Sequence, residues 1–162
     1  MSEGGSVEYN AKLLIKLIKN LSKDFPSVKV GILGDKAQKE HKDSKLTNAQ
    51  IGFLNEFGSF SRHIPKRSFL VTPLKVHLNS YIKQKKSLSP KEFEKAIEKG
   101  KQEEFAKKVG IVAEEVIQDA FATRGFGEWA PNAPSTIAQK GSDSPLIDTG
   151  ELRRSISSEV IK

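Results

Sequence analysis

The chain has 162 residues, with 27 Lys and Arg against 20 Asp and Glu, which gives a formal net charge of +7. A hydrophobic fraction of 36% and a charged fraction of 29% are typical of a folded globular protein. Because there is no cysteine, disulfides, thiol nucleophiles and zinc–thiolate sites are excluded. We expect a single domain over residues 1–162 that folds in a cytoplasm and has no membrane association, since no apolar run approaches the ~18 residues of a membrane span.

The N-terminal part begins with residues 1–6, which are small and polar and are expected to fray. Residues 7–23 place apolar side chains at helical spacing with lysines opposite them, which predicts an amphipathic helix. Apolar and polar residues alternate over 28–33 and predict a half-buried strand. Residues 35–45 are polar and carry both charge signs, so a loop is expected there.

The next element is a predicted helix of about three turns. Thr47 and Gln50 form a capping-box pair at its start, and Gly58 is a typical C-terminal stop. Its core-facing residues are expected to be Ile51, Leu54 and Phe57.

A brief extended segment at 68–71 is expected to add a strand, and Thr72-Pro73 then offers a helix start. Ser89-Pro90-Lys91-Glu92 is the strongest local signal, with Ser at the N-cap, Pro at N1 and Glu at N3. The apolar stripe beyond it predicts a long helix at about 101–122, separated by a break near Gly100.

Residues 123–150 hold four glycines, three prolines and the only tryptophan, Trp129. Loops longer than ~12–15 residues are uncommon in compact domains and are usually functional. One helical turn is expected at 135–140 and a final strand at 154–161. The fold class is therefore α+β: a small mixed or antiparallel sheet packed by several helices, with a long Gly/Pro-rich loop before the C-terminal strand.

No residue pattern indicates a catalytic, cofactor or metal site. The histidines, His41, His63 and His77, are not spaced as metal ligands, and we assign them no ligand or base role. Asp148-Thr149-Gly150 after an apolar pair has the local signature of an aspartic protease. Against that alternative, the preceding chain is largely helical and Glu151 stands where those enzymes place a small residue. We expect instead that Asp148 or Thr149 caps a helical turn at 150–153.

A lysine-rich segment, residues 83–108, holds nine Lys and five Glu and so carries +4 of the net charge. Interleaved Lys and Glu at helical spacing usually mark a solvated helix face. The alternative is a basic, nucleic-acid-associated protein with a nonspecific attraction to phosphate.

Two clusters of residues resemble a known family. The first covers 51–58 and 64–70, and the second covers 130–141 and 145–156. In order and spacing they are similar to the virion-morphogenesis, or tail-completion, proteins of tailed bacteriophages and prophages, over roughly residues 27–161. The framework residues of the resemblance are Asn55, Glu56, Phe57, Gly58, Pro65, Arg67, Phe69, Leu146, Asp148, Thr149, Gly150, Leu152 and Ser155. Ser68 departs from the pattern, which commonly has Pro there, and this is expected to loosen the turn.

The resemblance implies a non-enzymatic structural protein of the virion neck or tail, assembled in the host bacterial cytoplasm. It implies a homo-oligomeric ring, hexameric or dodecameric, between connector or head-completion proteins and tail-tube or tail-terminator proteins. Genomic DNA would pass through the ring. Within such a ring, Trp129 would be either a core plug or an anchor between subunits. The lysines expected to line or border the DNA channel are Lys36, Lys39, Lys42, Lys45, Lys83, Lys85 and Lys86.

Overall fold

The computed structural model describes residues 25–40, 45–147 and 150–161. The expected frayed end at 1–6 and the amphipathic helix at 7–23 lie outside the described residues. The strands are β1 (Ser27–Ile32) and β2 (Ile156–Ile161). The helices are α2 (Asp35–Gln38), α3 (Asn48–Phe57), α4 (Val71–Gln84), α5 (Pro90–Lys99), α6 (Gln102–Ala122), α7 (Pro134–Lys140) and α8 (Glu151–Arg154), with a 3₁₀ turn η1 (Lys86–Leu88).

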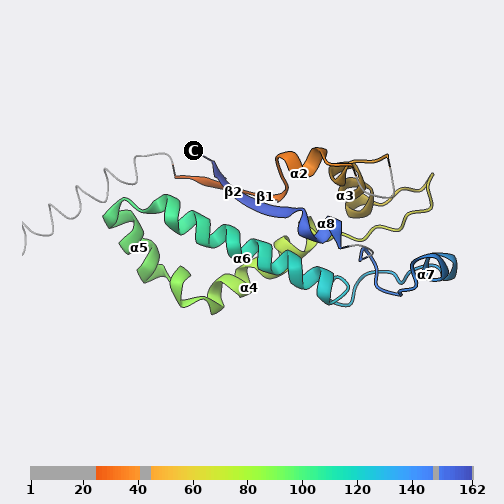
Figure 1. Cartoon of the computed structure of the whole chain (residues 1–162). Helices are drawn as coiled ribbons and strands as arrows, with labels where there is room; N and C mark the ends of the chain where they lie inside the picture. Colours follow the sequence, from red (N-terminus) through yellow and green to blue (C-terminus); the bar gives the residue numbers. More distant parts are fainter. Residues whose placement is uncertain (1–24, 41–44, 148–149, 162) are drawn as a thin grey trace, which may run out of the picture.

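The α+β class is confirmed, and the molecule is elongated (Figure 1). Helix α6 runs along its centre, with α4 and α5 packed on one side and the two strands on the other. The strands pair antiparallel, in a register that runs from Ser27 opposite Ile161 to Ile32 opposite Ile156. In the described part of the chain the sheet has these two strands. The predicted third strand at 68–71 is therefore wrong, because this segment leads directly into α4.

The break expected near Gly100 is present and separates α5 from α6. Gly100 adopts the left-handed conformation (φ 68°), and the N–H of Lys101 bonds back to Ala96 O at 2.7 Å. The core lies where α6 meets its neighbours, and its most deeply buried residues are Phe69, Val116, Ile117, Ala120 and Phe121.

A close approach between α6 and β2 requires glycine at position 110. A Cβ atom added to Gly110 would lie 3.0 Å from Cβ of Ser158 and 2.6 Å from its Oγ. Because Gly110 has no side chain, β2 can pack closely against α6 at this position.

Two expectations for the first helices need correction. Residues 35–38 form the short helix α2 instead of continuing a loop. Helix α3 begins at the predicted capping box, but Phe57 is 56% exposed, and the buried residues of the helix are Asn48, Gly52 and Glu56. The helix is thus rotated so that a polar stripe faces inward.

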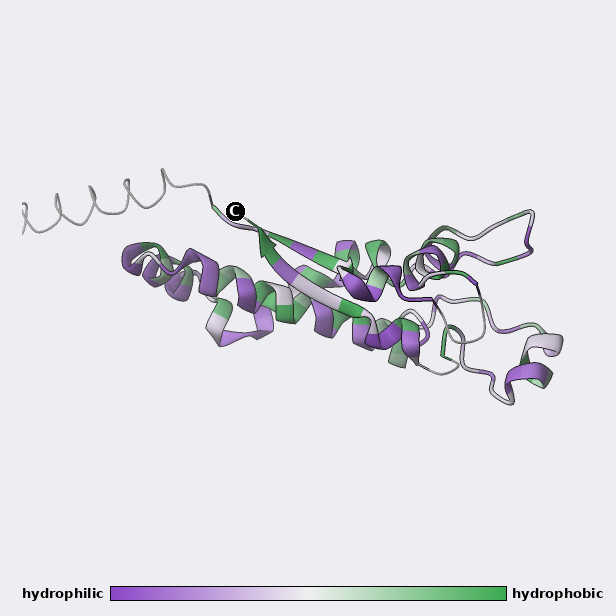
Figure 2. Cartoon of the chain, turned by 45° about the horizontal axis from the view of Figure 1, so that its top comes forward, coloured by the Kyte–Doolittle hydropathy of each residue, from purple (hydrophilic) through white to green (hydrophobic). Residues whose placement is uncertain are grey.

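Two segments project from the end of the molecule opposite α5 (Figure 1). One is the turn after α3, closed by paired hydrogen bonds between Ser59 and Ile64. The other carries α7, which begins at Pro134 and ends at a left-handed Gly141. Figure 2 shows hydrophilic residues over most of α5 at the other end, as the Lys/Glu pattern of 83–108 predicts for a solvated helix face.

Candidate binding cleft

Glu56 is a buried carboxylate at the start of α4. Helix α4 has Leu70 at its N-cap, and no side chain at that position accepts from the first turn. Glu56, 4% exposed, supplies the missing acceptor from α3. Its oxygens accept hydrogen bonds from Ser68 Oγ (2.5 Å) and from the backbone N–H groups of Phe69 (2.9 Å), Leu70 (3.0 Å) and Val71 (3.1 Å). The negative charge also suits the positive end of a helix dipole.

Ser68 tightens this junction, although its place in the family pattern predicts a looser turn. Its hydroxyl donates to Glu56 and accepts from the N–H of Thr72 at 2.9 Å. One hydroxyl therefore links α3 to the first turn of α4.

Arg67 joins the two clusters of the sequence. Its backbone N–H donates to Asn55 O, which ties it to α3. Its Nε and Nη2 donate to the backbone oxygens of Ala130 (2.9 Å) and Pro131 (2.8 Å), more than 60 residues away. Arg67 is 7% exposed, and burial lowers the pKa of its guanidinium. Its place in the fold therefore depends on both clusters.

Trp129 supports the same junction from inside the core. It is 9% exposed, its Nε1 donates to Ser68 O at 3.0 Å, and its ring meets Phe121 edge-on. Of the two roles expected from the sequence, this burial within a single chain favours the core plug.

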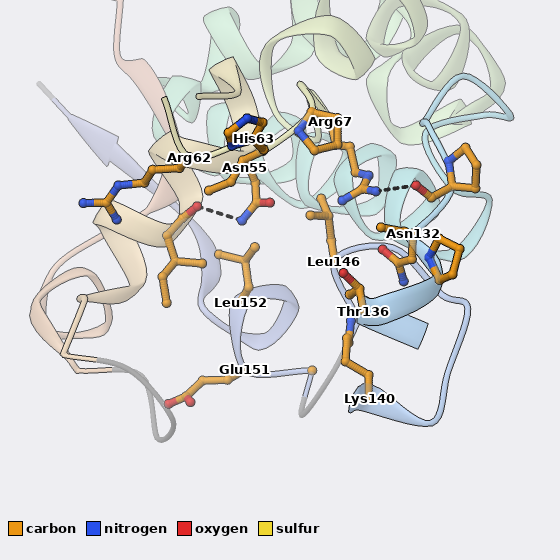
Figure 3. Close-up of a pocket in the computed structure, with 17 residues that line it drawn as sticks. Asn55, Arg62, His63, Arg67, Asn132, Thr136, Lys140, Leu146, Glu151 and Leu152 are labelled. Atoms are coloured by element: carbon orange, nitrogen blue, oxygen red, sulfur yellow. Dashed lines mark hydrogen bonds between the residues drawn. The ribbon is translucent and has the colours of Figure 1, made fainter. Parts of the chain in front are cut away.

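An open cleft of about 750 Å³ lies between the two projecting segments (Figure 3). One wall comes from α3 and residues 62–67, and the other from residues 131–140. Leu146 and Leu152 lie between the walls in Figure 3. Of the framework residues, Asn55, Pro65, Arg67, Leu146, Gly150 and Leu152 line the cleft.

The charged groups of the cleft are mainly positive. Arg62, Arg67 and Lys140 line it, together with His63. Glu151 also lines it, but its carboxylate pairs with Lys39 Nζ at 2.8 Å. Among the described lining residues, positive charge is therefore in excess.

Asn132 is the unusual polar residue of this cleft. The residue is 7% exposed, and its Nδ2 has no hydrogen-bond partner in the described part of the chain. Buried polar atoms without partners are rare in folded proteins and call for an explanation.

The second cluster continues into α8. Gly150 occupies the N-cap with a left-handed conformation. Asp148 and Thr149, which the sequence predicts as caps of this helical turn, lie outside the described residues. Leu152 is buried, and Ser155 Oγ donates to its backbone oxygen at 2.6 Å. These contacts set the direction in which β2 begins.

Three phenylalanines, which we call the phenylalanine patch, are exposed on and after α3. Phe53 is 64% exposed and Phe57 56%, and their rings lie 4.8 Å apart. Phe60, in the adjoining turn, is fully exposed. Single exposed apolar residues are normal on a surface, but two exposed rings in contact, with a third exposed in the adjoining turn, make a candidate interaction site.

The lysines singled out from the sequence do not form one cluster. Lys36, Lys39 and Lys45 lie at or near α2, whereas Lys83, Lys85 and Lys86 lie at the junction of α4 and α5, well away from it (Figure 1). Lys39 pairs with Glu151, and Lys85 pairs with Glu115 at 2.8 Å. Lys42 lies outside the described residues.

In the described ranges, no group of three or more His, Asp or Glu side chains could hold a metal ion. His63 lines the cleft and His77 stacks on Phe126, while His41 lies outside those ranges. Nor does the described chain contain a helix long and apolar enough to span a membrane. No protein-family model, curated protein or solved structure matches this chain.

Proposed function

We propose that this protein is a non-enzymatic structural subunit of a tailed-phage virion. In this role it completes the tail or neck and assembles as a ring at the head–tail junction. Its neighbours would be connector or head-completion proteins on one side and tail-tube or tail-terminator proteins on the other.

One observation carries the proposal: the two clusters of the family resemblance form a single unit at one end of the molecule. Arg67 bonds to Ala130 and Pro131, and Trp129 bonds to Ser68. Residues far apart in the sequence are thus used together, as expected if they are features of one family fold rather than chance matches.

The phenylalanine patch supports the assembly part of the proposal. An exposed group of large apolar side chains is unfavourable for an isolated chain in water and becomes favourable when a second subunit covers it. The patch lies on and after α3, which also forms part of one wall of the cleft. Both clusters of the family resemblance would therefore lie near the contacts between subunits.

The binding alternative, a basic nucleic-acid-associated protein, has weaker support. Its lysines are divided between two separate regions, and two of them are neutralised by carboxylates. A strong nonspecific binder would gather cations along one track of phosphates.

Deletion of the coding gene tests the proposal in the genome that carries it. We expect electron microscopy to show heads and tails that form but do not join. Complete, infectious particles without this protein would overturn the proposal, as would salt-sensitive DNA retention by a protein that never assembles.

A second experiment tests the assembly surface on the purified chain. Phe53→Ser with Phe57→Ser should leave a folded monomer, whereas the wild type should form rings that are detected by sedimentation velocity and negative-stain electron microscopy. Ile111→Ser is the matched control, because Ile111 is also 64% exposed but lies on α6. If the double variant assembled as well as Ile111→Ser, the phenylalanine patch would not be part of the subunit interface.

A further inference from the structure

We infer that the cleft binds a carboxylate-bearing peptide segment of another protein, and that Arg67 and Asn132 recognise the carboxylate. The inference concerns a different surface from the phenylalanine patch. It also stands independently of the proposed function, because it rests on the polar atoms of the cleft alone.

Arg67 supplies the first argument, through charge. A guanidinium has five N–H donors, and the backbone oxygens of Ala130 and Pro131 each occupy one of the donor nitrogens. No carboxylate in the described part of the chain pairs with Arg67, although it is 7% exposed. A buried cation without a counter-charge is unfavourable, so an anionic group arriving in the cleft would be bound strongly.

Asn132 supplies the second argument, through hydrogen bonding. Its Nδ2 is a donor with no acceptor among the residues that the structure describes, and the residue is more than nine-tenths buried. In Figure 3 Asn132 lies next to Thr136 on the wall formed by residues 131–140, and Arg67 reaches toward it from the other wall. A guanidinium on one wall and an amide N–H on the other can both donate to one ligand, and a carboxylate provides two acceptor oxygens.

The rest of the lining favours a peptide over a nucleic acid. The surfaces around these donors are apolar, formed by Ile51, Ile64, Leu146 and Leu152 together with prolines. Apolar walls with a few placed polar groups are typical of sites for small ligands and peptide side chains. A phosphate backbone would instead need a row of exposed cations. The about 750 Å³ of the cleft is enough for a few residues of chain.

The remaining charges agree with an acidic ligand. Arg62 and Lys140 add positive charge to the lining, and the one carboxylate of the described lining, Glu151, is already paired with Lys39. An acidic side chain entering the cleft would therefore meet attraction rather than repulsion.

The test uses the full chain labelled with ¹⁵N and three probes: the blocked peptides Ac-Leu-Asp-Leu-NH₂ and Ac-Leu-Asn-Leu-NH₂, and inorganic phosphate. The aspartate peptide should shift the side-chain amide resonances of Asn132 in a saturable way at or below about 10 mM. The asparagine peptide should bind at least about tenfold more weakly, which is the loss of one charge-assisted contact.

Asn132→Leu separates recognition from folding. Leucine has nearly the same size and removes the unpartnered donor, so the melting temperature should stay the same or rise. Binding of the aspartate peptide, followed by the fluorescence of Trp129, two residues before the cleft-lining Pro131, should weaken by about tenfold or more. Lys140→Gln, on the rim, should weaken it only about two- to threefold.

Several results would overturn the inference. Equal binding of the two peptides would show that the cleft does not recognise the carboxylate. Tighter binding of phosphate would indicate a phosphate site instead. Absence of any saturable shift would show that the cleft does not bind the peptides. A clear drop in the melting temperature of Asn132→Leu with unchanged peptide binding would show that Asn132 is only structural.

Discussion

Replacing Glu56 by glutamine should destabilise the protein strongly although the change is nearly isosteric. Each carboxylate oxygen of Glu56 accepts two hydrogen bonds: Oε1 from Ser68 and Val71, and Oε2 from Phe69 and Leu70. An amide nitrogen cannot accept, so either orientation of glutamine leaves two buried donors without an acceptor.

The magnitude follows from those two lost contacts. Hydrogen bonds to charged groups contribute about 1.5–3 kcal/mol each, so Glu56→Gln should lower the free energy of unfolding by at least about 3 kcal/mol. For a domain of this size that corresponds to a fall in melting temperature of about 6–12 °C. Thermal unfolding followed by circular dichroism and by the fluorescence of Trp129 measures it.

The matched control is Glu115→Gln. Glu115 also bonds a side-chain donor, Lys85 Nζ at 2.9 Å, but both side chains are partly exposed. Surface ion pairs contribute about 0–1 kcal/mol, so this variant should melt close to the wild type. If Glu56→Gln melted within about 2 °C of Glu115→Gln, the reasoning that α4 depends on a distant carboxylate would be refuted.

Three further predictions concern the core, the sheet and pH. Trp129→Ala should lower the free energy of unfolding, measured by urea titration, by about 3–5 kcal/mol and so unfold the monomer. A variant that stays a folded monomer but no longer forms rings would indicate instead that Trp129 is an anchor between subunits. Gly110→Val should lower the free energy of unfolding, measured in guanidinium, by about 1–3 kcal/mol because the valine side chain would collide with Ser158. An unaltered unfolding midpoint would contradict the close contact between α6 and β2. The hydrogen bond from Tyr81 to Asp119, at 2.7 Å, raises the pKa of the phenol from 10.0 to about 12. The folded state thus prefers the neutral phenol, so this contribution is complete below pH 10 and is lost as the pH rises to about 12. Absorbance titration should show one tyrosine ionising late, and Asp119→Asn should return its pKa toward 10. Ordinary ionisation of both tyrosines in the wild type would argue against the contact.

The helix boundaries were largely predictable because their signals are local. The capping box at Thr47, the cap at Ser89 and the left-handed Gly100 each act within one turn of the chain, and all three are observed. The same holds for the alternating strand at 28–33.

Contacts between distant elements were not predictable in this way. Helix α3 buries Asn48, Gly52 and Glu56, which occur at i, i+4 and i+8 but are not apolar, so hydropathy favoured the opposite face. The expected start at Thr72-Pro73 also hid the role of Glu56, because α4 begins at Val71, where Leu70 as N-cap offers no side-chain acceptor.

The candidate cleft was predictable only in its parts. Arg67 and Leu152 were singled out by the resemblance to tail-completion proteins, but nothing in the sequence indicates that they line one cleft. Asn132 was overlooked because an asparagine among prolines normally marks a turn, and its lack of a partner is a property of the folded chain.

The pairing of β1 with β2 has a consequence for synthesis on the ribosome. The two strands are separated by about 120 residues, and at ~5–20 residues per second β2 is made roughly 6–25 seconds after β1. Throughout that interval β1 has no sheet partner, and α6 is the surface that must hold it once made. The nascent chain is therefore most vulnerable to strand-mediated aggregation just before β2 emerges, and slowing translation near residue 150 would lengthen that period.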